Sequence, residues 1–334
     1  MAGHSDVHFF FAFRGNGNTK KTMKPGLRDF LWMAVGATIF GIIFVVVLTT
    51  SKDQTPAVRL ALKDQKVEIV NRMRTALASA SEAENSAVMA TTDEESQTFA
   101  NEARTATATL QQSRAQLSGL LDASGSPREK DLLAEFSKSF VNLERVDRDL
   151  LALAVQNTNL KAYRLAFGPA SEALQAADEA LAHLVTGYSE SNSADSRKII
   201  LLADDARISA LRIQTLLPPH IAEESDQKMD ELEARMTRED LAVRKILAGL
   251  AAIRGLAADK DLATAVARYE QFTEIRSQIL KLSRENTNVR SLAISLNQKR
   301  RAMLLCQDAL TGLEQEIEEA FIRDERSRAP VSTR

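Results

Sequence analysis

Apolar residues recur at steps of three and four along most of the chain beyond residue 56. One such stripe consists of Phe140, Leu143, Val146, Leu150 and Leu153, and another of Leu174, Ala177, Leu181 and Leu184. These steps place the side chains on one face of a helix, whereas the alternation typical of a strand is nowhere sustained. The pattern therefore predicts an all-α protein.

Prolines and capping residues divide this helical sequence. Beyond residue 50, proline occurs only at positions 56, 127, 169, 218, 219 and 330, and proline is favoured at the first position of a helix. Thr92 and Glu95 have the spacing of a capping box, and Pro218-Pro219 is interpreted as a helix start. The predicted helices are 57–90, 93–123, 127–157, 160–189, 192–217, 220–254, 257–286 and 288–325.

Residues 30–50 carry no charged side chain and lie between Arg28-Asp29 and Lys52-Asp53. About 20 apolar residues suffice to cross a bilayer as a helix, so this segment is predicted to be a single transmembrane helix, preceded by a disordered segment at 1–29. A buried core helix is the alternative, but such a helix normally has a polar face. Five Lys and Arg residues precede the span and three follow it within a similar distance. This bias favours a cytoplasmic N-terminus and a helical region on the opposite side of a bacterial inner membrane, or of an internal membrane derived from it.

The sequence repeats itself. Arg114, Leu117, Gly119, Leu120 and Lys130 recur 130 residues later as Arg244, Leu247, Gly249, Leu250 and Lys260, and further along the offset becomes 129. The repeat predicts two tandem duplicated antiparallel helical bundles, at 51–190 and 191–325, followed by a basic tail at 326–334. The alternative is that helices pack across the copies into one longer bundle.

The triplet Asn-Thr-Asn occurs in both copies, at 157–159 and 286–288. Asn157 and Asn286 fall on the apolar stripe. Three interpretations remain open. Asparagine tolerates left-handed backbone geometry and so marks a turn, a buried asparagine fixes helix register, or the triplet contacts a ligand.

Residues 150–184 resemble the end of the four-helix-bundle sensor domain of bacterial chemoreceptors. The resemblance is carried by Gln156-Asn157-Thr158-Asn159-Leu160-Lys161-Ala162-Tyr163 and then Phe167-Gly168-Pro169. Ala170 and Ser171 follow Pro169, where the amino-acid sensors of that family have Thr and Gln. The family implies a membrane-anchored sensor, in which Arg72 or Arg74 would bind a small anion. Its signal would pass through a separate partner, because neither a second span nor a transmitter follows. On architecture, the chain also resembles membrane-shaping magnetosome proteins, which bind and tubulate liposomes.

Composition argues against several other functions. The formal net charge of −2 offers no general attraction for nucleic acid, and the single cysteine, Cys306, excludes an intramolecular disulfide. Cys306 lies on an apolar stripe and is predicted to be buried. The histidines beyond the span, His183 and His220, stand in different copies without metal-site spacing. We therefore expect a non-enzymatic protein without metal or cofactor.

Between residues 276 and 301 the charged residues are almost all basic. Glu285 is the one acid there, among Arg276, Lys281, Arg284, Arg290, Lys299, Arg300 and Arg301. These seven are the candidate lipid contacts, since a basic helical surface attracts anionic lipid. The leading hypothesis is a protein that binds or organises a lipid bilayer, and the alternatives are the sensing module and an envelope assembly scaffold. A homo-oligomer through Ala37 and Gly41 is expected, with another membrane or cytoskeletal protein as a further possible partner.

Overall fold

The computed structural model describes residues 55–191 and 194–328, and the chain divides into two compact units, 1–58 and 59–334. The predicted disordered segment 1–29 and the predicted span 30–50 lie outside the described residues. Within the described ranges every regular element is helical, which confirms the all-α class. None of these described helices combines the length and the apolar character needed to cross a membrane.

The helices follow one another with short connections. Their bounds are α2 Pro56–Met89, α3 Asp93–Ser124, α4 Pro127–Ala154, α5 Thr158–Phe167, α6 Pro169–Ser189, α7 Ser196–Ala222, α8 Asp226–Ala251, α9 Lys260–Glu285 and α10 Thr287–Ile294, then a π-helical segment η1 at Ser295–Lys299, and α11 Arg300–Arg328. Residues 326–328, expected to belong to a tail, continue α11.

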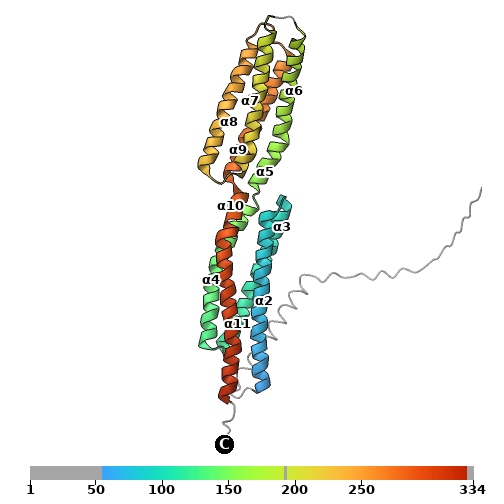
Figure 1. The fold of residues 1–334 in the computed structure, drawn as a ribbon. Helices are drawn as coiled ribbons and strands as arrows, with labels where there is room; N and C mark the ends of the chain where they lie inside the picture. The colour runs from blue at the N-terminus through green and yellow to red at the C-terminus, as the bar shows by residue number, and fades with distance from the viewer. Residues whose placement is uncertain (1–54, 192–193, 329–334) are drawn as a thin grey trace, which may run out of the picture. The chain divides into compact units, whose positions relative to one another are not determined.

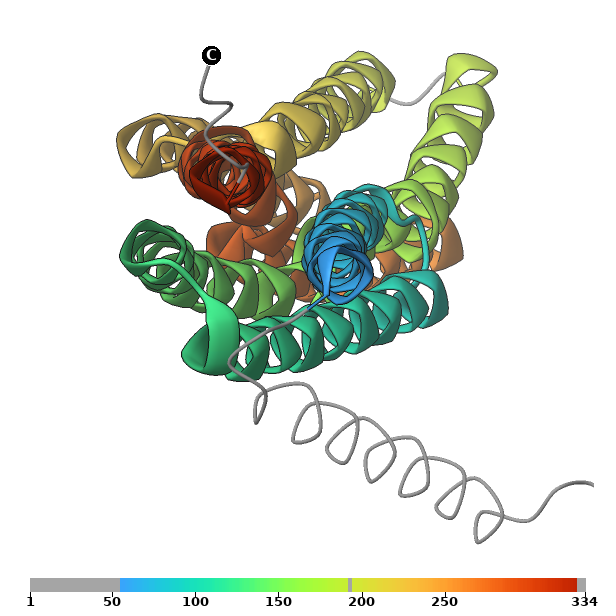
Figure 2. The same cartoon turned by 90° about the horizontal axis from the view of Figure 1, so that it is seen from below.

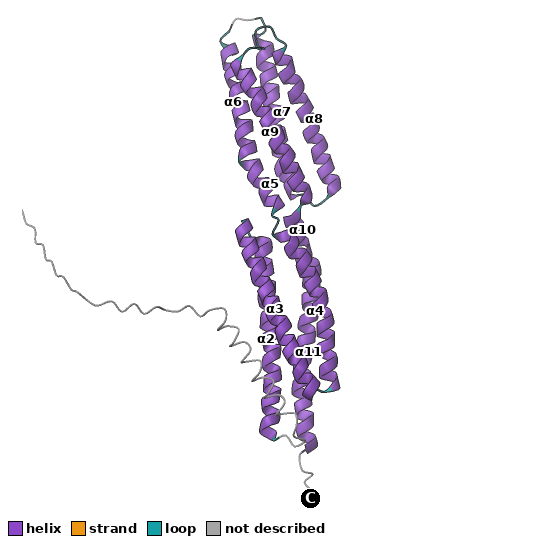
Figure 3. Cartoon of the chain, turned by 180° about the vertical axis from the view of Figure 1, so that it is seen from behind, coloured by secondary structure: helices purple, strands orange, loops and turns teal. Residues whose placement is uncertain are grey.

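The helices of the larger unit form two bundles, which we name by their place in the chain. The terminal bundle comprises α2, α3, α4 and α11, and the central bundle comprises α6, α7, α8 and α9, with α5 and α10 between them (Figure 1). Figure 3 shows the same arrangement from behind. In the view from below, α2 and α11 are seen nearly end-on beside α4 (Figure 2). Arg59 and Glu325, near opposite ends of the chain, form an ion pair with an N–O distance of 2.6 Å.

Each bundle contains helices from both copies of the repeat. The helix α11, from the second copy, packs on α4, whereas α6, from the first copy, packs on α9 and α7. This differs from the expected division at residues 190 and 191, and it corresponds instead to packing across the copies. Figure 1 shows how this arises: after α4 the chain continues through α5 into the central bundle and does not fold back along α4.

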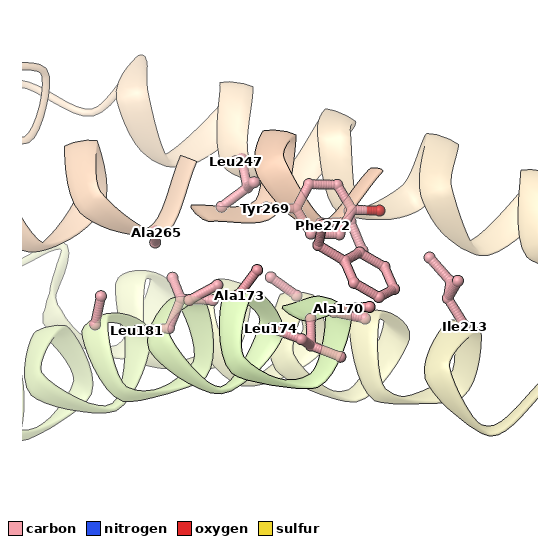
Figure 4. Close-up of a cluster of buried hydrophobic side chains, with 14 of the residues drawn as sticks. Ala170, Ala173, Leu174, Leu181, Ile213, Leu247, Ala265, Tyr269 and Phe272 are labelled. Atoms are coloured by element: carbon pink, nitrogen blue, oxygen red, sulfur yellow. The ribbon is translucent and has the colours of Figure 1, made fainter. Parts of the chain in front are cut away.

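The core of the central bundle is built from alternating small and large apolar side chains. Leu174 of α6, Ile213 of α7 and Phe272 of α9 are at most 2% exposed, and Ala170 and Ala173 fill the narrow places between them (Figure 4). Full burial of a large apolar side chain contributes about 1.5–3 kcal/mol. Because alanine lets two backbones approach closely, this Ala and Leu pattern accounts for the close contact of α6 with α9.

Three helix boundaries differ from the sequence prediction. Pro218 and Pro219 lie in the last turns of α7 and do not start a helix. The apolar stripe continues past them through the buried side chains of His220 and Ile221, so burial outweighs the backbone hydrogen bonds that the prolines cannot donate. The predicted helix 160–189 is divided at Gly168, and the one at 288–325 contains the unpredicted π-helical segment.

The helix starts show the expected capping chemistry. Thr92 Oγ1 accepts from the backbone N–H of Glu95 at 3.1 Å, as predicted, but the Glu95 carboxylate accepts from Thr91 and not from Thr92. A complete capping box, which the sequence analysis missed, joins Ser126 and Glu129 at the start of α4. These caps satisfy backbone N–H groups that have no partner within their helix.

Candidate functional site

Three ionisable side chains meet inside the terminal bundle: Glu84 of α2, Asp147 of α4 and Lys299 of η1. Lys299 Nζ lies 2.8 Å from Glu84 Oε2, and the two side chains are 4% and 2% exposed. Lys299 also donates to the Ser81 carbonyl and to Asn85 Oδ1, both at 3.0 Å. The ammonium group therefore has an acceptor for each of its three protons.

Asp147 is the least satisfied member of this cluster. Its residue is 8% exposed, and its Oδ1 atom is buried with no hydrogen-bond partner. Burial, reinforced by the neighbouring Glu84 carboxylate, raises the pKa of Asp147 to about 8 against the opposing pull of Lys299. Burial also raises the pKa of Glu84, although Lys299 counteracts it. At neutral pH we therefore take Glu84 as ionised and paired with Lys299, and Asp147 as protonated.

A crevice of about 580 Å³ opens beside these carboxyl groups, between α2, α3 and α4. Glu84 and Asp147 line it, together with Gln111 of α3 and Glu144 of α4. The Gln111 side-chain amide donates to Glu144 Oε1. The lining thus contains three carboxyl groups and also the two guanidinium groups of Arg104 and Arg148, and we treat the crevice as the candidate site.

The other copy of the repeat has different residues at the positions that correspond to this cluster. Burial in α2 and α7 coincides at an offset of 133 residues, so that Met73, Leu77 and Ala80 correspond to Ala206, Ala210 and Ile213. At the same offset Glu84 corresponds to the buried Leu217. At the offset of 129, Asp147 corresponds to Arg276 and Lys299 to Ala170. The central bundle therefore has no equivalent of the acid–lysine–acid cluster.

Local backbone geometry helps to place Lys299. The residue ends the π-helical segment Ser295–Lys299, which joins α10 to α11. A π-helical turn holds more residues than an α-helical turn, and such turns occur frequently at functional sites. The wider turn rotates the following residues about the helix axis and delivers the Lys299 side chain to the interior, where it is 3% exposed.

The central bundle has a polar cluster of its own around His220. His220 Nδ1 lies 2.8 Å from Ser283 Oγ, and Nε2 lies 2.8 Å from Glu233 Oε1. Burial lowers the pKa of His220, against the pull of Glu233. The order serine, histidine, carboxylate is that of a hydrolase triad, but Ser283 is 0% exposed. A substrate has no route to its hydroxyl, so we assign the cluster a structural role.

The two Asn-Thr-Asn triplets meet where the bundles join. Thr158 Oγ1 and Thr287 Oγ1 lie 3.1 Å apart, and each accepts from the backbone N–H of the other threonine at 3.1 Å. Asn159 Nδ2 donates to Asn286 Oδ1 at 2.7 Å, and Asn288 Nδ2 donates to Asn157 Oδ1 at 3.0 Å. The first interpretation is confirmed, because both Asn157 and Asn286 have left-handed backbones at helix ends. Both residues are also buried, as the second interpretation requires, and its claim that they fix helix register stays a prediction.

The seven basic candidates for lipid contact do not form one surface. Arg276 pairs with Asp240 at 3.3 Å, Arg284 with Glu233 at 2.7 Å, and Lys299 with Glu84. Four candidates remain exposed, namely Lys281, Arg290, Arg300 and Arg301. Three of the seven candidates are thus held in ion pairs within the fold, and the other four are exposed.

Exposed leucines accompany these exposed arginines. Leu292, Leu296 and Leu304 are 40%, 62% and 50% exposed, and with Arg300 they recur at steps of four residues. We call these four residues the leucine row. With Val88 and Met89 of α2, the row lines a groove of about 410 Å³. Met89 is 71% exposed, so the groove has an apolar rim as well as an apolar floor.

The remaining predicted residues have ordinary surroundings. Arg74 is paired with Glu314 of α11 and also donates to Thr311. Arg72 donates to Gln116 of α3 at 3.5 Å on the surface. Cys306 is fully buried, as predicted, and burial raises the pKa of its thiol to about 12. Neither arginine is among the residues that line the crevice.

No family model and no curated protein matches the chain. The resemblance to chemoreceptor sensor domains remains a prediction.

Proposed function

We propose that this chain is a non-enzymatic, membrane-anchored helical protein that binds and organises a lipid bilayer through the leucine row and the arginines beside it. The observation that carries the proposal is the coincidence of three exposed leucines with Arg290, Arg300 and Arg301 on one short segment, residues 290–304. Large apolar side chains gathered at an exposed surface mark an interaction site.

The chemistry of the segment favours anionic lipid as the partner. Leucine side chains enter the boundary between headgroups and acyl chains, while arginines remain at the charged headgroups. Each Arg near an anionic surface contributes about 1 kcal/mol at low salt. Three exposed arginines and three leucines therefore supply a modest affinity. Many copies on one surface, as expected for a homo-oligomer, would multiply it.

The predicted span at residues 30–50 fits this proposal. It would hold the helical region at the surface of a bacterial inner membrane, or of an internal membrane derived from it, with the N-terminus in the cytoplasm. A topology reporter fused after Arg334 tests that orientation. Activity of a reporter that works only outside the cytoplasm supports it, and activity of a strictly cytoplasmic reporter refutes it.

Co-sedimentation of residues 52–334 with liposomes tests the lipid proposal. We expect binding to vesicles containing phosphatidylglycerol, weaker binding as salt rises, and little binding to pure phosphatidylcholine. The double variant R300E/R301E should lower the apparent affinity by at least about tenfold. Lys299 is left unchanged, because it belongs to a buried ion pair. Electron microscopy of the same samples shows whether bound vesicles become tubules.

The matched control carries the same charge change on another helix. Arg238 and Lys245 are exposed on α8, so R238E/K245E changes the net charge equally without touching the leucine row. If both double variants lose binding to the same extent, the attraction is general and the proposed face is wrong. If the unchanged protein does not bind anionic vesicles at low salt, the proposal fails altogether.

Ligand sensing is the second candidate function, and the crevice beside Asp147 is the observation that favours it. The predicted anion contacts Arg72 and Arg74 do not line this crevice. A sensing role would therefore use a different site, and a different ligand chemistry, from those that the family resemblance implies.

A further inference from the structure

The crevice in the terminal bundle has a surplus of hydrogen-bond acceptors. Asp147 Oδ1 is buried without a donor. Glu84 and Glu144 add further carboxyl oxygens to the lining. An unpaired buried polar atom destabilises the folded state, so a structure keeps one only where something else offsets that cost. A ligand that brings N–H donors would do so.

The basic groups nearby do not supply these donors. Lys299 is directed at Glu84, Ser81 and Asn85. The guanidinium of Arg104 donates to Asn101 on its own helix at 2.8 Å. Arg148 is exposed on α4. Arg104 and Arg148 both line the crevice, yet neither guanidinium donates to Asp147 Oδ1, which has no partner.

We propose that this crevice is a binding site for a small organic ammonium ion, whose N–H groups donate to Asp147 and Glu144. Within the described residues, no group of three His, Cys, Asp or Glu side chains is placed to hold a metal ion. An ammonium needs fewer ligands, because its three protons each seek a single acceptor. The volume of about 580 Å³ leaves room for a short alkyl chain beside Leu151 and Ala152.

The Asp147 carboxyl group must reorient to receive the ligand, because Oδ1 is itself covered. Rotation about the terminal torsion of an aspartate is a soft, two-fold motion, so the reorientation requires no backbone change. The alkyl part of the ligand would lie toward the apolar side of the crevice. The ammonium group would lie between α2 and α4.

Binding is coupled to a proton. Asp147 enters the reaction as the neutral acid, the ammonium ion arrives with its charge, and the complex pairs the ammonium with the carboxylate. One proton therefore leaves to solvent for each ligand bound. The groups that face Asp147 are Glu84 from α2, Lys299 from η1, Glu144 from α4 and Cys306 from α11. The affinity should rise with pH up to the pKa of Asp147, about 8, and then level off.

Titration calorimetry on the full-length chain in detergent tests the site. The probes are ethylammonium and butylammonium chloride, and tetramethylammonium chloride is the control because it carries the same charge without an N–H donor. We expect the first two to bind and the third to bind at least tenfold more weakly. The heat should depend on the ionisation enthalpy of the buffer, because protons are released.

Two substitutions locate the binding. D147N should lower the alkylammonium affinity at least tenfold, whereas D149N, the same change on the exposed face of the same helix, should leave it unaltered. Ala152 lines the crevice and is exposed, so A152L fills it without disturbing the core and should also abolish binding. Circular dichroism shows whether each variant is folded.

The proposal is overturned by either of two results. One is the absence of binding by either alkylammonium up to about 10 mM at pH 8. The other is alkylammonium binding that survives both D147N and A152L in folded protein. The site is independent of the leucine row, so R300E/R301E should bind alkylammonium as the unchanged protein does.

Discussion

Two lysines are buried in the terminal bundle, each against a glutamate. Lys66 Nζ lies 3.0 Å from Glu129 Oε1, and Lys299 makes the corresponding pair with Glu84. Loss of one partner from such a pair costs about 3–5 kcal/mol, although the pair contributes little against a well-packed apolar alternative. At the offset of 133, the buried Ile199 stands where Lys66 would be. The terminal bundle therefore carries charge where the repeat shows that an apolar side chain suffices for folding.

His220 makes the stability of the central bundle depend on pH. Burial lowers its pKa in the folded state, while the unfolded chain has a pKa near 6.5. The unfolded state therefore binds more protons in the window below about 6.5. Stability is fully present above that pH and falls as the pH drops toward the lower, folded pKa.

We therefore expect H220Q to lower the free energy of unfolding by about 1–3 kcal/mol at pH 7.5, because Ser283 and Glu233 lose a partner. The difference from the unchanged protein should shrink at pH 5.5. Urea unfolding at both pH values measures it. Because His183 is 75% exposed, H183Q serves as the matched control and should behave as the unchanged protein. An H220Q penalty that is equal at both pH values would show that His220 does not carry the pH dependence.

The candidate site escaped sequence analysis for an identifiable reason. Glu84 and Asp147 are two of 45 acidic residues, and acidic side chains are mostly exposed in folded proteins. Asp147 directly follows Val146 of the apolar stripe, so it lies at the edge of the apolar face, and the pattern does not show whether it is buried. For Glu84, the internal repeat indicates that the position faces the core, because its counterpart Leu217 is apolar. The burial match that aligns α2 with α7, however, emerges only from the structure.

At the scale of elements, the left-handed residues Asn157 and Asn286 define where the long helices are interrupted. Their φ values are 52° and 53°, a region that costs residues with a Cβ about 1–2 kcal/mol. The asparagine side chains also serve the junction. Asn157 Nδ2 donates to Ser96 Oγ at 2.9 Å, and Asn286 Nδ2 donates to the Glu223 carbonyl at 2.8 Å.

Two substitutions at one position separate these contributions. N286G removes the side-chain hydrogen bonds but suits the backbone, so it should cost about 1–2 kcal/mol. N286A removes the same bonds and adds the left-handed strain, so it should cost about 1 kcal/mol more. Equilibrium unfolding in urea measures both. If the two variants are equally stable, backbone strain at residue 286 is not what asparagine relieves.

Helix positions followed from the sequence wherever caps and prolines act locally. The starts predicted at 93 and 127 are observed, and the start predicted at 57 lies one residue after the observed start at Pro56. The start at Pro169 is not among the predicted ones, because the predicted helix 160–189 runs across Gly168-Pro169. Pro218-Pro219 misled the prediction because a proline pair is tolerated where a buried stripe continues past it. The π-helical segment at Ser295–Lys299 has no sequence signal of its own. Its last residue, Lys299, is buried against Glu84 of α2, a tertiary contact that the local sequence does not indicate.

At the scale of the molecule, the exchange of helices between the copies makes the two bundles interdependent. The bundle containing α4 is completed by α11, more than 140 residues later in the chain, and the bundle containing α9 is completed by α6. The repeat in the sequence correctly indicates two copies. It cannot indicate which copy supplies the last helix of each bundle, because α6 and α11 present similar apolar stripes.

Chain division tests this interdependence. Residues 52–190 contain α2 to α6, so they lack α11, and the core of their bundle would expose Leu143 and Leu150, which are at most 3% exposed in the intact chain. We expect this fragment alone to unfold without a cooperative transition. Residues 191–334 lack α6, so this fragment alone should also unfold without a cooperative transition. Mixed together, the two fragments should bind each other and recover a cooperative thermal transition, because the missing helices are then present in trans.

Circular dichroism melts of each fragment and of the equimolar mixture, with size-exclusion chromatography of the mixture, measure this. A fragment that melts cooperatively alone, with no complex in the mixture, would mean that each copy completes its own bundle by a different packing.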